Sequence, residues 1–219
     1  ILDVEKRSNQ PYRLGSFTLI FNGEIYNYLE IKALLLKEGI NFDTTGDTEV
    51  LARALVQWGI DATLDRLEGM WAFAFYNKNS GNLYLCRDRF GEKPLYFTNQ
   101  NDGIYFSSET KSLFQLLGRR LDFNFDQIHR YLINGYKSIY KHNSTFYNKV
   151  QEVSQGQWVK INKDLKLTVG TYWKPNLKVN ETLNYMDSVE KVREDLRRSV
   201  SLRLRSDVPI AFCMSGGID

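Results

Sequence analysis

The chain has 219 residues, of which 25% are charged, and its formal net charge is only +3. This length suits one large domain, or one domain with part of another. The small charge, with no run of Lys and Arg, argues against a nucleic-acid partner, and the two cysteines, Cys86 and Cys213, provide no disulfide framework. With no apolar run long enough for a bilayer and no secretory signal, we expect a cytoplasmic protein without a membrane partner.

The stretch FTLIFNGEIYNY, residues 17–28, changes character halfway. A β-favouring apolar run is followed by Asn22, Gly23 and Glu24, and the spacing predicts a turn there and a helix over 28–38. The three polar residues suit a simple turn. They also suit a ligand site, because an amide and an unhindered backbone N–H can bind an oxyanion and a carboxylate can bind an ammonium group. Spacing alone favours the turn.

The segment that follows, residues 41–59, predicts a second helix. Asp47 or Thr48 is expected at its N-cap, with apolar residues at helical spacing behind it and Gly59 at its end. For Asp47 taken by itself, capping is the better interpretation. A carboxylate at a loop tip can equally hold a ligand's ammonium group.

The middle of the chain reads mostly as short strands at hairpin spacing. Residues 70–76 alternate large aromatic with small side chains and are apolar on both faces, which predicts a strand covered on both sides. Further strands are expected at 82–88, 95–98, 104–107, 157–161 and 165–172, with helices at 109–117 and 126–133. Arg87 and Asp88 are interpreted as an internal ion pair. The order predicts an α+β architecture with antiparallel sheets.

The end of the chain changes again. Residues 174–185 read as an interdomain linker, a helix is expected from Asp187, and an apolar strand over 208–214 leads into Ser215-Gly-Gly-Ile-Asp219. A strand that runs into Ser-Gly-Gly predicts a phosphate-binding loop, since backbone N–H groups and the next helix N-terminus face the anion. Because the chain starts without Met and stops in this loop, we expect an internal piece of a longer protein.

Six segments together resemble one family: FNGEIYNY, TGDTEV, LEGMWAFAFYN, RDRFGEKPLYF, FSSETK and SDVPIAFCMSGGID. In this order and spacing they are similar to the glutamine-hydrolysing asparagine synthetases, which are class II glutamine amidotransferases. The resemblance covers essentially the whole chain. It implies an N-terminal-nucleophile hydrolase domain, an αββα sandwich of antiparallel sheets, over residues 1–173. A linker over 174–186 and the start of an α/β ATP-pyrophosphatase domain over 187–219 would follow.

The activity that the resemblance implies is that of a carbon–nitrogen ligase in asparagine biosynthesis. A cysteine at the mature N-terminus, with its own α-amino group as base, hydrolyses L-glutamine through a thioester. The ammonia passes through an internal tunnel to the second domain. There ATP, with Mg²⁺, adenylates L-aspartate, and ammonia displaces AMP to give asparagine. These small molecules are the expected partners, and the oligomeric state is left open.

Site residues follow position by position from the resemblance. The side chain of Asn22 and the backbone N–H of Gly23 look like the oxyanion hole. Glu24 and Asp47 look like glutamine-binding carboxylates, with Asp47 on the α-ammonium. The implied glutamine site also includes backbone contacts from Ile1 and Leu2. The implied ATP site comprises Met214, Ser215, Gly216, Gly217 and Asp219, of which Asp219 could position Mg²⁺.

The chain departs from the family pattern in two ways that bear on activity. The nucleophilic cysteine and the arginine that binds the α-carboxylate of glutamine are both absent, and neither Cys86 nor Cys213 can lie at a free N-terminus. The 219 residues alone are therefore expected to hydrolyse no glutamine and to make no asparagine. Two alternatives stay open: a related enzyme that amidates a sugar or another carboxylate, and a non-catalytic binding protein with the glutaminase fold.

Overall fold

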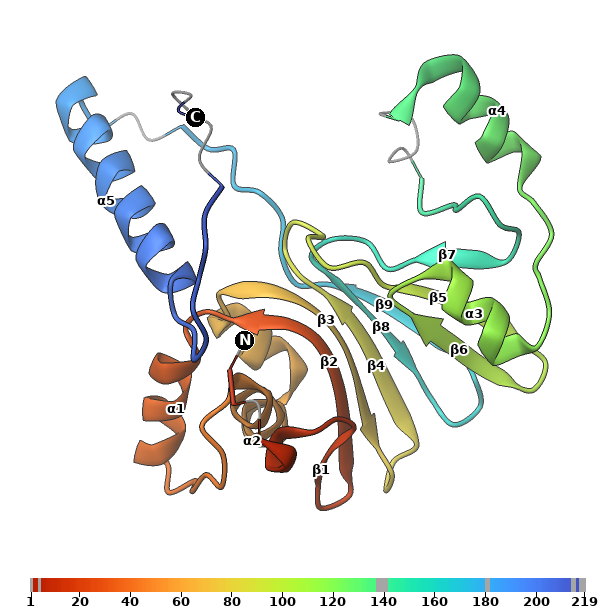
Figure 1. Ribbon diagram of the computed structural model, residues 1–219, viewed down its shortest axis with the longest axis horizontal. Coiled ribbons are helices and arrows are strands. Elements are labelled where there is room, and N and C mark those ends of the chain that lie inside the picture. The colour runs from red at the N-terminus through yellow and green to blue at the C-terminus, as the bar shows by residue number, and fades with distance from the viewer. Residues whose placement is uncertain (1, 4, 137–141, 180–181, 214–215, 217–219) are drawn as a thin grey trace.

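The computed structural model describes residues 2–3, 5–136, 142–179, 182–213 and 216. Its described part is an α+β sandwich in which two antiparallel sheets lie face to face between helices (Figure 1). The predicted fold class is therefore confirmed. The helices are η1 (Lys6–Ser8), α1 (Tyr28–Lys37), α2 (Asp47–Arg66), α3 (Thr110–Leu117), α4 (Phe125–Asn134) and α5 (Tyr185–Arg203).

The larger sheet has six strands in the order β1-β2-β3-β4-β8-β9, and every neighbouring pair is antiparallel. Its strands are β1 (Tyr12–Leu14), β2 (Phe17–Ile25), β3 (Gly69–Asn77), β4 (Asn82–Arg87), β8 (Gln157–Ile161) and β9 (Leu167–Thr171). The smaller sheet has the order β6-β5-β7, with β5 (Tyr96–Gln100), β6 (Gly103–Ser107) and β7 (Val150–Glu152). The short strands β1 and β7 were not predicted.

Three apolar clusters hold the layers together. One lies between α1, α2 and the outer face of the larger sheet, one lies between the two sheets, and one lies between the smaller sheet and α3. Strand β3 contributes to the first two clusters. Its aromatic residues Trp71 and Phe73 face the helices, while Ala72 and Ala74 face the other sheet. The prediction that this strand is covered on both sides is confirmed, and its alanines let the second sheet approach closely.

The predicted turn at residues 22–24 is wrong, because β2 runs straight through them. Gly23 lies opposite Trp71 in the register with β3. A Cβ added to Gly23 would lie 2.1 Å from the carbonyl oxygen of Met70, far inside contact distance. The glycine is thus required for the close approach of two strands rather than for a chain reversal.

Replacing Gly23 with alanine is expected to destabilise the fold by about 1–3 kcal/mol, because the new methyl group must push β2 and β3 apart. Urea unfolding of the variant should show a lower midpoint. Gly103→Ala is the matched control, since a Cβ at that strand glycine would meet no atom within 4 Å. An unchanged midpoint for Gly23→Ala would contradict the packing argument.

The start of α2 also differs from the prediction by one residue. Gly46 is the N-cap and Asp47 is the first helical residue, so Asp47 does not cap the helix. The predicted helix end at Gly59 corresponds to a break in α2. Gly59 has a non-helical φ of 76°, and a second helical piece follows it to Arg66. Glycine permits this kink, and residues beyond it pack again on the core.

Arg87 and Asp88 do not form the predicted ion pair. The Arg87 guanidinium donates to Glu152 Oε1 at 2.6 Å and to the carbonyl oxygen of Val153 at 3.0 Å. The Asp88 carboxylate, fully buried, accepts backbone N–H groups from Trp71, Phe90, Glu92 and Lys93 at 3.0–3.2 Å. Each charged group binds several groups of a loop and so has more hydrogen-bond partners than an Arg87–Asp88 ion pair would give it.

The C-terminal helix α5 meets the sandwich near α1 at its C-terminal end, while its other end projects away (Figure 1). In the predicted linker, residues 174–179 and 182–184 form no helix or strand, while Tyr185 already begins α5, two residues before the predicted start. The strand predicted over 208–214 is not formed by residues 208–213, and Ile210 and Phe212 are exposed. A strand needs neighbouring backbone for its N–H and C=O groups, and no described strand lies beside this segment. Met214 lies outside the described residues.

Candidate active site

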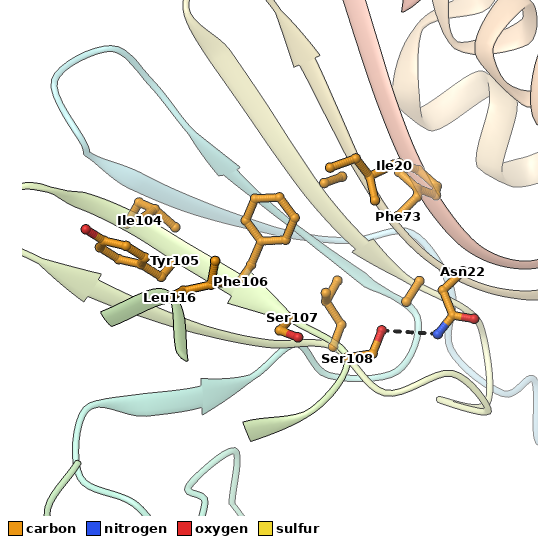
Figure 2. A pocket seen from close by; sticks show the side chains of 12 residues that line it. Ile20, Asn22, Phe73, Ile104, Tyr105, Phe106, Ser107, Ser108 and Leu116 are labelled. Atoms are coloured by element: carbon orange, nitrogen blue, oxygen red, sulfur yellow. Dashed lines mark hydrogen bonds between the residues drawn. The ribbon is translucent and has the colours of Figure 1, made fainter. Parts of the chain in front are cut away.

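Asn22 lies where the two sheets diverge, at the rim of a cavity of about 480 Å³ (Figure 2). The cavity wall is mostly apolar and comes from both sheets, with Ile20 on one side and Phe106 on the other. Asn22 is exposed, and its side-chain Nδ2 donates to Ser108 Oγ at 3.1 Å. The amide is therefore held at a polar point on an apolar wall, where its second hydrogen can serve a ligand.

Beyond Leu19, where the pairing with β1 ends, the edge of β2 that faces away from β3 is bound by side chains on both sides of Gly23. The side-chain amide of Gln10 binds both the N–H and the carbonyl oxygen of Phe21, at 2.6 and 2.7 Å. Two residues beyond Gly23, the N–H of Ile25 donates to Asp47 Oδ2 at 2.8 Å. Because alternate residues of a strand direct their backbone groups to the same edge, the N–H of Gly23 points to the edge between these two caps.

Asp47 is buried, with 6% of its surface exposed, although it carries a carboxylate. Burial raises its pKa from 3.8 to about 6, the N–H of Ile25 works in the opposite direction, and the neighbouring charge of Glu24 raises it further. Glu24 precedes Ile25, whose N–H binds Asp47, and the two carboxylates repel each other. A cationic ligand group between them would remove that repulsion and favour the ionised form of Asp47.

The loop before Asp47 is fixed by Asp3. The Asp3 carboxylate accepts the backbone N–H of Thr45 at 2.8 Å and its hydroxyl at 3.2 Å. These hydrogen bonds, led by the one from the Thr45 backbone and aided by Arg7, hold the pKa of Asp3 well below its usual range. Leu2 lies beside the same loop, since its carbonyl oxygen would be 3.8 Å from a Cβ on Gly46. Ile1 lies outside the described residues.

The predicted glutamine-site residues are thus brought together as far as they are described. Asn22, Gly23 and Glu24 follow one another on β2, Asp47 reaches the same strand through Ile25, and Leu2 lies by the loop that carries Asp47. The predicted ATP-site residues cannot be placed in this way. Only Gly216 is described, with φ of 80° and open space around it, and the other four lie outside the described residues.

The sequence did not predict the part that three residues play at this site. Gln10 binds the edge of β2, Ser108 binds Asn22, and Asp3 fixes the loop before Asp47. Each acts across the chain, with Ser108 lying 86 residues from Asn22 in sequence. No spacing pattern connects such pairs, because their proximity depends on how the sheets pack. Ser108 does lie in the segment FSSETK, which was one of the six segments of the resemblance, and this was the only signal available.

The two cysteines differ in surroundings, and neither lies at the cavity. Cys86 is fully buried on β4, and burial raises the pKa of its thiol well above the ordinary value. Cys213 is exposed in the C-terminal segment. Within the described ranges, no cluster of three His, Cys, Asp or Glu side chains could hold a metal ion. None of the described helices is long and apolar enough to cross a bilayer.

Two family models match the chain. The model described as "Glutamine amidotransferase domain" matches residues 1–173, and the model described as "Asparagine synthase" matches residues 191–219. The first match contains Asn22, Gly23, Glu24 and Asp47, and the second contains the segment of the predicted phosphate loop.

Curated relatives match over the entire chain. Asparagine synthetase [glutamine-hydrolyzing] 1 of Bacillus subtilis is 38% identical over 221 aligned residues, and asparagine synthetase [glutamine-hydrolyzing] 2 of the same organism is 35% identical over 229. The chain spans about a third of the length of these relatives, 34% and 30%.

Among solved structures, the B. subtilis glutamine phosphoribosylpyrophosphate amidotransferase matches with a TM-score of 0.52 at 23% identity, covering 80% of this chain and 31% of that one. At this identity the likeness concerns the fold alone. It supports the pairing of the two antiparallel sheets described above.

Proposed function

We propose a function from the premise that this chain belongs to the glutamine amidotransferase domain family: in the full-length protein it hydrolyses L-glutamine and supplies ammonia for the ATP-driven amidation of L-aspartate. The observation that carries the proposal is the meeting of Asn22, Gly23, Glu24 and Asp47 at one end of β2. Oxyanion donors beside a carboxylate pair fit an amino acid with an amide side chain.

In the proposed mechanism the nucleophile is the N-terminal cysteine that the resemblance implies, with its α-amino group as base. This chain's residues then act on the substrate. The Asn22 side-chain N–H and the Gly23 backbone N–H donate hydrogen bonds to the carbonyl oxygen of the glutamine side chain. They stabilise the negative charge that develops there as the tetrahedral intermediate forms. Glu24 and Asp47 hold the α-ammonium group and orient the side chain toward the cavity beside Asn22. Backbone contacts from Ile1 and Leu2 belong to the same proposal.

The synthetase half of the proposal rests on the resemblance and on the match over 191–219. Met214, Ser215, Gly216, Gly217 and Asp219 would bind ATP, and Asp219 is proposed to position Mg²⁺. ATP would supply the adenylate leaving group that ammonia displaces. The division into residues 1–173, 174–186 and 187–219, the cytoplasmic location and the absence of nucleic-acid or membrane partners are also part of the proposal.

The experiment that tests the function is a comparison of two proteins. The full-length protein should release ammonia and glutamate from glutamine, and with ATP and Mg²⁺ it should convert aspartate to asparagine. The 219 residues alone should do neither. Offering a uronic acid in place of aspartate tests the related amidotransferase activity. Full-length protein that binds glutamine without hydrolysing it would contradict the enzyme proposal and favour a binding protein.

Glutamine affinity is expected to depend on pH through Asp47. Because the pKa of Asp47 is raised to about 6, the carboxylate is ionised at pH 7 and becomes protonated as the pH falls below 6. The protonated acid cannot pair with the ammonium group, so KM for glutamine should rise by up to about tenfold per pH unit below 6. KM values measured from pH 5 to 8 check this.

The matched control for the pH series is Asp43→Asn, which removes an exposed carboxylate from the loop before α2. This variant should keep the same rise in KM. A KM that stays constant between pH 5 and 8 in the wild-type protein would show that Asp47 does not bind the ammonium group.

A further inference from the structure

We propose that Asp207, in the segment after α5, is a positioning residue for the glutamine site: it holds Asp47 in place through Asp3. The proposal rests on the proposed function, because Asp47 is taken as the carboxylate that binds the ammonium group of glutamine. Asp207 belongs to residues 191–219, which match the asparagine synthase model, so a segment of the second unit would shape a site in the first.

The first contact is between Asp207 and the start of the chain. The backbone N–H of Asp3 donates to Asp207 Oδ2 at 2.9 Å, across 204 residues of sequence. Asp3 has a positive φ of 43°, which is uncommon for a residue with a side chain. A hydrogen bond to its N–H from outside the segment helps to keep this residue in that conformation.

The second contact passes from Asp3 to the loop before α2. While its N–H is bound by Asp207, its carboxylate accepts the N–H and the hydroxyl of Thr45. Gly46 packs directly against it, since a Cβ on Gly46 would lie 3.0 Å from the Asp3 Cβ. Thr45 and Gly46 immediately precede Asp47. The backbone that sets the position of Asp47 is therefore held by Asp3, and Asp3 is held by Asp207.

Arg205 independently binds the backbone on the other side of Asp47, at the end of β2. Its guanidinium donates to the carbonyl oxygen of Tyr26 at 2.8 Å and forms two hydrogen bonds of 2.6 Å with the Glu30 carboxylate. Tyr26 follows Ile25, whose N–H binds Asp47. Arg205 thus binds the turn at 26–27 directly, and Asp207 reaches the loop at 44–46 through Asp3.

The pKa of Tyr28 agrees with the position of Asp207 near Asp47. Burial raises the pKa of the Tyr28 phenol, and the negative charges of Asp207 and Asp47 raise it further. Both carboxylates therefore act on one hydroxyl group. Arg205 lowers the pKa of this phenol, while Glu30 raises it together with the two aspartates.

The test measures glutamine hydrolysis by the full-length protein. Asp207→Ala should raise KM for glutamine about fivefold and leave kcat within about twofold, because one positioning hydrogen bond is lost and no group that contacts the reacting atoms is touched. Asp207→Asn should restore KM to within about twofold of wild type, since its carbonyl oxygen can accept the same N–H. Arg205→Ala should raise KM by itself, so the test does not depend on one variant folding.

Arg198→Ala is the matched control. Arg198 also forms a bidentate ion pair across this junction, with Glu68 at 2.5 and 2.8 Å. In the described part of the chain it forms no hydrogen bond or ion pair with the loop at 44–46. It should leave KM within about twofold. Provided that the wild-type protein hydrolyses glutamine, two results overturn the positioning role. One is an unchanged KM in both Asp207→Ala and Arg205→Ala. The other is an Arg198→Ala variant whose KM rises as much as theirs. A wild-type protein that hydrolyses no glutamine overturns the proposed function, and this role with it.

Discussion

Replacing Asn22 with alanine is expected to lower kcat for glutamine hydrolysis by a factor of about 10²–10³ in the full-length protein, with KM changed by less than about threefold. The reason is that the amide serves the oxyanion, which exists only after attack on the substrate. In the structure the Asn22 Nδ2 is already held at 3.1 Å from Ser108 Oγ, on the rim of the cavity between the sheets. Little reorganisation would be needed when the charge develops.

Steady-state kinetics of Asn22→Ala, measured beside Asn99→Ala, check this expectation. Asn99 is an exposed asparagine on β5 of the smaller sheet, so its removal deletes the same chemical group from a strand away from the site. It should leave kcat unchanged. If Asn22→Ala instead raised KM at constant kcat, the side chain would bind the ground state and the oxyanion assignment would be wrong.

Replacing Asp47 with asparagine is expected to have opposite effects on binding and on stability. KM for glutamine should rise about 10–100-fold at pH 7.5, because the ammonium group loses a charged partner in a buried site. Stability should increase. The folded protein raises the pKa of Asp47 from 3.8 to about 6, so at neutral pH it carries an ionised group that the fold disfavours.

The sign of this stability effect follows from the two pKa values. Below pH 4 the acid is protonated in both states and the mutation changes little. As the pH rises from about 4 to 6, the unfolded chain loses its proton first, so the wild-type fold loses stability, by at most about 3 kcal/mol above pH 6. The gain in the thermal midpoint of Asp47→Asn should therefore be present at pH 7.5 and small at pH 4. Asp43→Asn serves again as the control, and a gain independent of pH would contradict the assigned burial cost.

Local sequence patterns predicted most of the elements and their order. The alternation in residues 70–76 gave a strand buried on both faces, and the strand pairs at 82–87 and 157–171 lie where expected. Predictions failed where a residue serves a distant neighbour. Gly23 reads locally as a turn residue, but the strand continues because it pairs with β3, and the nearby carbonyl oxygen of Met70 leaves no room for a Cβ. Glu152, the actual partner of Arg87, is 65 residues away and has no sequence signal.

The candidate site was predictable in a similar way. The types of Asn22, Gly23, Glu24 and Asp47 suggested an oxyanion and an ammonium group. Their convergence depends on Ile25, which pairs with Gly69 of β3 on one edge and donates its N–H to Asp47. Periodicity carries no information on that contact. The same is true of Gln10, whose amide takes the place of a strand neighbour for Phe21.

The pairing of β4 with β8 has a consequence for the newborn chain. Strands β1 to β4 leave the ribosome together, but the next strand of their sheet, β8, begins about 70 residues after β4 ends. At ordinary translation speeds this interval lasts roughly 4–14 seconds. Throughout it β4 is paired with β3 on one edge, but its other edge has no neighbour, so a stalled or slowly read message between the two strands would favour self-association of nascent chains.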